Sequence, residues 1–215
     1  MIVSHRHRFV FMKTRKTAGT SVEIALSRVC GPDDVITPLP PPDEKLRAQS
    51  GGRPPQNYES PPLPVKVHQH VWAAKAAQAL GPDVWSSYLR FAVERNPWDA
   101  VVSLYFWVSR HGPERPPFEE FVQQEKIERL ARRNYGITHV GKEPAVDRFL
   151  RFEHLAQDMT EVWVDLGLPG QPDLPRAKAR ARPAAAAYRA FYTEESRARV
   201  AQVFHRTIAE RGYTF

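Results

Sequence analysis

Short apolar runs alternate with segments of helical periodicity along this chain. The runs at residues 8–13, 88–94 and 148–153 are rich in β-favouring side chains, which is typical of buried strands. Apolar residues at helical spacing follow each run, and the helices predicted in this way cover about residues 20–29, 71–80, 98–110, 118–132, 154–166 and 193–211. Strands that alternate with helices predict an α/β fold, in which a central, mainly parallel sheet is flanked by helices.

The segment at residues 31–64 interrupts this alternation because it is dense in proline. Proline lacks the backbone N–H and fixes φ, so the segment is predicted to contain neither a regular helix nor a central strand. We therefore expect a long surface loop or lid here. The length of 215 residues suits one full-sized domain, which is predicted to span residues 1–215.

Composition narrows the range of functions only partly. The proportions of hydrophobic residues (42%) and charged residues (26%) are typical of a globular protein and exclude wholesale disorder. No apolar run has the length of a membrane-spanning helix or the position of an export signal, so a cytoplasmic protein is expected. The single cysteine, Cys30, excludes an internal disulfide framework and a multi-cysteine metal site. The net charge of +7 favours an anionic ligand, which includes nucleic acids, phosphorylated cofactors and acidic substrates.

The first motif, Lys-Thr-Arg-Lys-Thr-Ala-Gly-Thr-Ser at residues 13–21, links a predicted strand to a predicted helix. Thr20 and Glu23 have the spacing of a capping box, which places the helix start at Thr20 or Ser21. Backbone amides at a helix start attract anions, and Gly19 lets the backbone approach a phosphate closely. The alternative is an ordinary strand-to-helix turn with polar surface residues. The side chains that add an ammonium group and hydroxyls here are Lys16, Thr17, Thr20 and Ser21.

The second motif covers residues 90–103, with the sequence Arg-Phe-Ala-Val-Glu-Arg-Asn-Pro-Trp-Asp-Ala-Val-Val-Ser. Arg95 ends a predicted strand, and Asn96 followed by Pro97 predicts the start of a helix. Arg95 and Ser103 are therefore expected to face the carboxyl edge of the sheet, where open α/β sheets bind ligands. A guanidinium can donate two hydrogen bonds to one phosphate. The alternative is a capped helix whose arginine is merely solvated.

These two motifs resemble the cofactor site of the sulfotransferases that use 3′-phosphoadenylyl sulfate (PAPS). Residues 13–21 look like that family's 5′-phosphosulfate loop, and residues 90–103 look like its 3′-phosphate site. The resemblance implies a P-loop-like, three-layer sandwich in which Lys16 contacts the oxygen that bridges phosphorus and sulfur. It also implies that Arg95 and Ser103 bind the 3′-phosphate. The residues that it places around the 5′-phosphate are Arg15, Thr17, Ala18, Gly19, Thr20 and Ser21. Arg182, in the basic segment at residues 169–187, is implied to touch the nucleotide.

A histidine pair, His68 and His70, lies just before a predicted helix. Alternation along an extended segment puts both imidazoles on one side, and a neutral imidazole can accept a proton near pH 7. The glycan sulfotransferases, particularly the uronyl 2-O type, have a His-x-His pair at this point in chain order. That resemblance implies that His70 is the base and that His68 supports it. The alternative is a pair of surface histidines, and no metal is predicted because no third ligand has matching spacing.

The sequence therefore predicts an enzyme that moves the sulfuryl group of PAPS to an acceptor hydroxyl and releases 3′,5′-adenosine bisphosphate, without a metal. A P-loop kinase or other ATP-using phosphotransferase is the main alternative, but it needs the Walker A order and a metal-binding carboxylate. A nucleic-acid-binding module is disfavoured because the positive charge is spread along the chain. The histidine pair favours a carbohydrate or glycoconjugate acceptor. A lipid at a membrane surface or a small natural-product hydroxyl stays open.

Overall fold

The computed structural model describes residues 1–110, 115–175 and 187–215. Contacts between Cα atoms divide the chain into two compact units. We call Met1–Glu94 together with Gly136–Ala177 the sheet unit, and Arg95–Tyr135 together with Lys178–Phe215 the helical unit. The single domain expected over residues 1–215 stays a prediction.

A five-stranded sheet with the order β3-β1-β2-β4-β7 forms the centre of the sheet unit. Its three predicted strands, β2 (Phe9–Met12), β4 (Leu89–Glu94) and β7 (Arg148–Arg151), are parallel neighbours. Two short strands were not predicted: β1 (Ile2–Ser4) pairs antiparallel with both β2 and β3 (Val35–Ile36). The α/β class is confirmed, but the prediction of a mainly parallel sheet is wrong, because two of its strand pairings are parallel and two are antiparallel. Strands of two or three residues are too short to give a recognisable alternating pattern.

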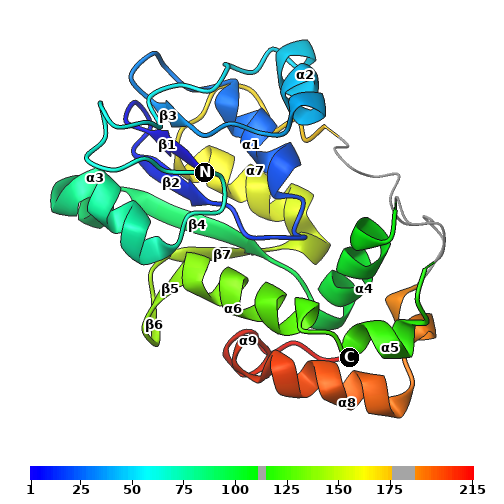
Figure 1. Ribbon diagram of the computed structural model, residues 1–215. Helices are drawn as coiled ribbons and strands as arrows, with labels where there is room; N and C mark the ends of the chain where they lie inside the picture. Colours follow the sequence, from blue (N-terminus) through cyan, green and yellow to red (C-terminus); the bar gives the residue numbers. More distant parts are fainter. Residues whose placement is uncertain (111–114, 176–186) are drawn as a thin grey trace. The chain divides into compact units, whose positions relative to one another are not determined.

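Helices pack on both faces of this sheet, because successive side chains of a strand point to opposite faces (Figure 1). Phe11 and Phe91 pack with α1 (Gly19–Ser27) and α7 (Leu155–Asp165), while Met12 and Ala92 pack with α3 (Ala73–Ser87). The helix α3 bends at Gly81, whose φ of 76° interrupts the helical backbone. The other elements of this unit are the hairpin β5 (His139–Val140) and β6 (Glu143–Pro144) and the 3₁₀ turn η1 (Phe152–His154).

The proline-rich segment contains a regular helix, α2 (Pro41–Gln49), so the prediction of a wholly irregular loop at residues 31–64 is wrong. Its prolines occupy the N-cap and the first helical positions, where a missing N–H costs nothing. The side chain of Arg47 in this helix is fully buried and donates hydrogen bonds to Glu44 and to the carbonyl oxygen of Thr37. The helix is thus packed into the sheet unit.

Aromatic side chains form the core of the helical unit. Tyr105 and Phe106 of α4 (Pro97–Val108) pack against Phe118 and Phe121 of α5 (Phe118–Val122). The helices predicted at residues 118–132 and 193–211 are each divided in two. The elements that complete this unit are the 3₁₀ turn η2 (Tyr188–Phe191), α8 (Glu194–Val203) and α9 (His205–Arg211). The helix α6 (Lys126–Thr138) crosses the boundary between the units.

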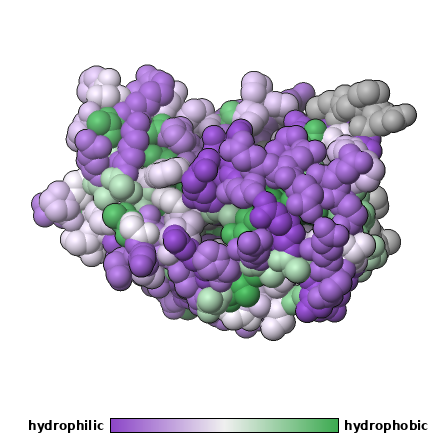
Figure 2. Space-filling view, turned by 60° about the horizontal axis from the view of Figure 1, so that its bottom comes forward, coloured by the Kyte–Doolittle hydropathy of each residue, from purple (hydrophilic) through white to green (hydrophobic). Residues whose placement is uncertain are grey.

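Hydrophilic side chains predominate on the face shown in Figure 2, where apolar residues form small, separate patches. Among the described residues, the large apolar side chains that are exposed are Trp72, Val108, Val140 and Val164. No helix within the described ranges combines the length and the apolar character that crossing a bilayer requires.

Candidate functional site

The loop between β2 and α1 contains two non-glycine residues in the left-handed region of backbone conformation. Lys16 has a φ of 66° and Ala18 a φ of 59°. Such conformations cost free energy in residues that carry a Cβ atom, and they cluster at functional sites. Alternation between left-handed and other conformations turns successive N–H groups toward one concavity, which is a geometry that suits anions. The loop also leads into the N-terminus of α1, the positive end of that helix.

The predicted capping box at Thr20 and Glu23 is wrong. The helix α1 begins at Gly19, its N-cap is Ala18, and no side chain caps it. Glu23 is instead fully buried, where its Oε2 accepts a hydrogen bond from Lys13 Nζ at 2.6 Å. The other carboxylate oxygen of Glu23 accepts from the α-amino group of Met1. Glu23 thus bonds to Lys13 and to the Met1 amino group and does not cap the helix, since a buried carboxylate needs a compensating charge.

Charge compensation shifts two pKa values in this buried cluster. Burial by itself would raise the pKa of Glu23, but the positive charges of Lys13 and of the Met1 amino group outweigh it and lower the pKa to about 2. Burial lowers the pKa of the Met1 amino group to about 5, although Glu23 opposes that shift. The charge of Lys13 is therefore balanced inside the protein, and Arg15 and Lys16 are the half-buried cations that the loop presents.

Threonines fix the shape of the loop. The Thr14 hydroxyl donates to the carbonyl oxygen of Val93 in β4, and Thr14 Oγ1 lies 2.8 Å from Thr17 Oγ1. The hydroxyl of Thr17 thus belongs to the loop's own bonding, whereas the resemblance implies a phosphate contact for this residue. Thr20 and Ser21 are both buried in the first turn of α1.

Gly19 is required by packing. A Cβ atom at this position would lie 2.7 Å from Lys13 Cγ and 3.3 Å from Lys13 Cε. The glycine thus leaves room for the Lys13 side chain to reach Glu23.

The histidine pair stands in a turn, so the prediction of an extended segment is wrong. The Val71 amide donates to the carbonyl oxygen of His68 at 3.1 Å, and His68 Nδ1 accepts from the His70 amide at 3.2 Å. Between the two histidines, Gln69 Oε1 accepts from Lys13 Nζ at 2.8 Å. The turn is therefore attached to the phosphate-loop candidate through Lys13, a contact that neither motif predicts.

His70 itself is bonded to the loop. Its Nδ1 lies 2.9 Å from the carbonyl oxygen of Lys13, and because a carbonyl can only accept, Nδ1 carries the proton. Burial lowers the pKa of His70 to about 3, the nearby charges of Lys13 and Arg15 act in the same direction, and the bond to the Lys13 carbonyl opposes them. The imidazole is neutral near pH 7, and its Nε2 holds the basic lone pair.

Arg95 and Ser103 belong to the helical unit. The side chain of Asn96 accepts from the Trp98 amide at 3.1 Å, and Pro97 is the first residue of α4, so the predicted helix start is confirmed. Arg95 Nε and Nη2 both donate to Asp99 Oδ2, at 2.8 and 2.7 Å. Ser103 is half-buried on the same helix. Asp99 is thus a partner of the predicted phosphate ligand that the motif did not assign.

Arg182 lies outside the described residues, so its predicted contact with the nucleotide stays a prediction. The sheet unit brings together the loop at residues 13–21, Glu23, Gln69 and His70. Glu23 was recognisable in the sequence as the one acidic residue in the apolar run Val22–Leu26, although its partners were not.

An uncharacterized protein of Archaeoglobus fulgidus is 32% identical to this chain over 97 residues, which make up 44% of the chain and 81% of the archaeal protein. The chain belongs to the family of this archaeal protein. No family model and no solved structure matches the sequence.

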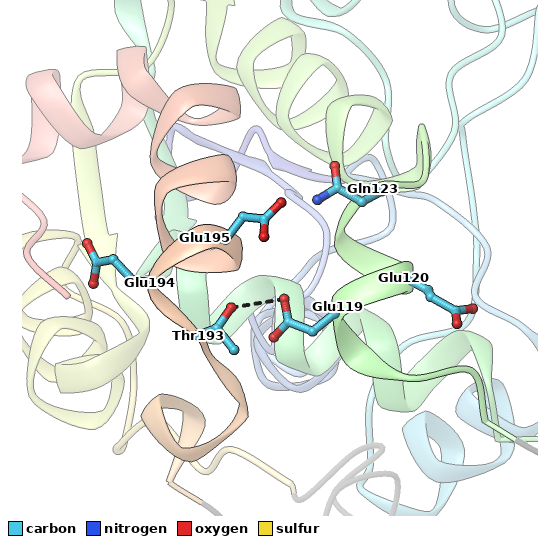
Figure 3. A pocket seen from close by; sticks show the side chains of 6 residues that line it. All are labelled: Glu119, Glu120, Gln123, Thr193, Glu194 and Glu195. Atoms are coloured by element: carbon cyan, nitrogen blue, oxygen red, sulfur yellow. Dashed lines mark hydrogen bonds between the residues drawn. The ribbon is translucent and has the colours of Figure 1, made fainter.

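A surface pocket of the helical unit is acidic, in contrast to the loop between β2 and α1 (Figure 3). Glutamates of α5 and α8 surround it, and the Thr193 hydroxyl donates to Glu119 Oε2 at 3.0 Å across it. So many carboxylates would repel a phosphorylated ligand, which makes the loop of the sheet unit the better candidate for an anion. The residues that line the pocket are Glu119, Glu120, Gln123, Thr193, Glu194 and Glu195. In the part of the chain that the structure describes, no three His, Cys, Asp or Glu side chains are grouped as metal ligands.

Proposed function

We propose that this protein is a PAPS-dependent sulfotransferase that acts on a hydroxyl acceptor. The observation that carries the proposal is the hydrogen bond from His70 Nδ1 to the carbonyl oxygen of Lys13. It joins a neutral imidazole to a loop whose backbone and cations suit a phosphate. A base beside an anion site is the combination that sulfuryl transfer to an alcohol requires.

The donor set of the loop fits the charged end of PAPS. Lys16 and Ala18 in left-handed conformations, the start of α1 and the cations Arg15 and Lys16 all favour a compact, multiply charged anion. We further propose that Arg95 and Ser103 hold the 3′-phosphate, which distinguishes this cofactor from ordinary adenylates. The P-loop-like, three-layer arrangement implied by the resemblance is part of this proposal, and the helices on both faces of the sheet support it.

When bound, PAPS supplies a sulfuryl group that is activated by its bond to a phosphate. His70 Nε2 accepts the proton of the acceptor hydroxyl as the new bond between oxygen and sulfur forms. The bond between sulfur and the phosphate oxygen breaks, and Lys16 balances the charge that develops on that oxygen. Fixed cations that stabilise developing charge are among the largest contributions to such transfers.

The pKa of about 3 applies to His70 in the protein without bound PAPS. Lys13 and Arg15 both lower this pKa by their charge, and phosphate groups beside them would offset that effect. Burial is the larger cause of the low pKa, so donor binding is expected to raise the pKa of His70 only by offsetting these two charges. PAPS binding would thus increase the basicity of His70.

A transfer assay tests this function. The protein is incubated with sulfur-labelled PAPS and a panel of oligosaccharides, sterols and phenols, and in parallel with labelled ATP and Mg²⁺. We expect label in an acceptor from PAPS only, with release of 3′,5′-adenosine bisphosphate. Transfer from ATP and none from PAPS would replace this proposal with a phosphotransferase.

A further inference from the structure

Trp72 is an aromatic side chain that the proposed chemistry does not use. It exposes 50% of its surface, whereas the other large apolar side chains exposed among the described residues are valines. Its backbone is extended, with φ −71° and ψ 149°, and it stands at the N-cap position of α3. Trp72 therefore directly follows the turn that carries His68 and His70.

The indole of Trp72 lies with one face against Gly136. A Cβ atom at Gly136 would be 3.0, 3.1 and 3.2 Å from Cδ2, Cε2 and Cε3 of the indole. Cδ2 is a ring-fusion carbon with three bonded ring neighbours, so another atom can approach it this closely only from above the ring plane. Gly136 thus packs against one face of the ring, and a larger residue at this position would be too close to the indole.

The same anchored segment carries the indole and the proposed base. Trp72 is two positions after His70, which keeps their Cα atoms within about 7 Å of each other. Val71 between them is buried, and His70 and Gln69 are both bonded to Lys13. A ligand on the indole therefore lies on the part of the sheet unit that holds His70.

We propose that Trp72 is the stacking platform for the acceptor, and that the acceptor is a carbohydrate. A pyranose ring has an apolar C–H face that suits a flat indole and a rim of hydroxyls that suits polar neighbours. The neighbours are of that kind, because His68 and Lys75 are exposed on either side of Trp72 in the chain. An alkyl chain would need a continuous apolar surface, but Ala74 is the other exposed apolar residue within residues 68–75. This inference rests on the proposed function, since it names the substrate of the same site.

Three variants of the full chain test the platform: Trp72→Ala, Trp72→Phe and the control Val164→Ala. Val164 is an apolar residue on α7 of the same unit and is 74% exposed. The substrates are a uronic-acid tetrasaccharide, a neutral tetrasaccharide and 1-decanol, each with PAPS as donor. We expect Trp72→Ala to raise the KM for a tetrasaccharide about tenfold, with a smaller change in kcat, as when a stacking aromatic is removed. Trp72→Phe should restore part of this loss, and Val164→Ala should have no effect.

Two further measurements separate this inference from the proposed function. Calorimetry with 3′,5′-adenosine bisphosphate should give the same affinity for all variants, which shows that they are folded. A tetrasaccharide should quench tryptophan fluorescence in the wild type and not in Trp72→Phe. Quenching without any binding of the bisphosphate would support the platform and contradict the sulfotransferase. Bisphosphate binding with an unchanged KM in Trp72→Ala, or faster transfer to 1-decanol than to either tetrasaccharide, would overturn the platform alone.

Discussion

The loop of the sheet unit and Arg95 of the helical unit are both proposed to bind phosphate, but different contacts hold them. Lys13 in the loop is 3% exposed and bonds to Glu23 and to Gln69, which lies 56 residues further along the chain. Arg95 is 10% exposed and bonds to Asp99, four residues later on the same helix. The contacts of Lys13 thus join distant parts of the sheet unit, whereas the ion pair of Arg95 with Asp99 is local to one helical turn.

This difference has a chemical consequence. In the loop, the carboxylate of Glu23 neutralises Lys13, and Lys16 and the backbone amides are the groups proposed to bind the anion. At Arg95, the carboxylate holds the very guanidinium that is proposed to bind the 3′-phosphate. We therefore expect changes in the loop to affect stability and turnover, and changes at Asp99 to affect affinity for one ligand.

The largest effect is expected for His70. His70→Asn keeps an N–H that can reach the carbonyl oxygen of Lys13 but removes the basic Nε2, so turnover should fall about 10²–10⁴-fold while affinity for 3′,5′-adenosine bisphosphate is retained. Turnover is measured with labelled PAPS, and affinity by calorimetry. His70→Ala is the companion variant that loses both groups. Near-normal turnover in His70→Asn together with loss of turnover in His70→Ala would reduce His70 to a structural role.

Stability should respond most to Glu23. Glu23→Gln leaves the buried Lys13 without its counter-charge, so the free energy of unfolding, measured by urea denaturation, should fall by about 3–5 kcal/mol. Glu194→Gln is the control, because Glu194 pairs with Arg197 at 3.0 Å on the surface and should contribute less than about 1 kcal/mol. Equal costs for the two variants would mean that the buried cluster does not hold the loop.

Gly19→Ala should disturb the buried cluster around Lys13 by steric crowding. The added methyl group would meet Lys13 Cγ at 2.7 Å, and Lys13 is fixed by Glu23 and Gln69, so the free energy of unfolding should fall by about 1–3 kcal/mol. Gly31→Ala is the matched control, since the nearest atom to its new methyl group is 3.9 Å away. Thermal denaturation of both variants checks the prediction, and a Gly19→Ala protein as stable as Gly31→Ala contradicts it.

The stability of the protein at acidic pH should also depend on His70. The pKa of His70 is about 3 in the folded protein, below its usual value of 6.5. The neutral imidazole therefore stabilises the folded protein above pH 6.5. This contribution is lost as the pH falls from 6.5 toward 3. His70→Asn should therefore lose less stability than the wild type between pH 6.5 and pH 4. In nitrogen NMR titrations, the pKa of His70 should rise when 3′,5′-adenosine bisphosphate is added. A pKa that stays near 6.5 without ligand would remove the basis of both expectations.

The smallest effect is expected at Asp99. Asp99→Ala removes the acceptor that orients Arg95, which should weaken binding of 3′,5′-adenosine bisphosphate about tenfold and leave 5′-AMP unaffected. Asp99→Asn keeps an oxygen that can accept from Arg95 Nε, so its loss should be smaller. Equal losses for the two nucleotides would show that Asp99 acts on the fold of the helical unit instead.

Local patterns in the sequence predicted much of this architecture. The apolar runs predicted the strands β2, β4 and β7, and Asn96 followed by Pro97 predicted the start of α4. The failures arose where a distant partner decided the outcome. Glu23 has the spacing of a capping residue, yet it binds Lys13 in the folded core, and the histidine segment turns because Lys13 holds Gln69 and His70. Charge compensation between remote residues leaves no periodic signal in a single sequence.

Calorimetry with 3′,5′-adenosine bisphosphate, 5′-AMP and ATP with Mg²⁺ measures whether this protein recognises both phosphorylated ends of the nucleotide. If the loop binds the 5′ end of the nucleotide and Arg95 with Ser103 binds the 3′-phosphate, the bisphosphate should bind at least tenfold more tightly than 5′-AMP, because a guanidinium bond to a phosphate is lost with AMP. Its affinity should not depend on Mg²⁺. Equal affinity for the bisphosphate and 5′-AMP, or tightest binding of ATP with Mg²⁺, would contradict the account.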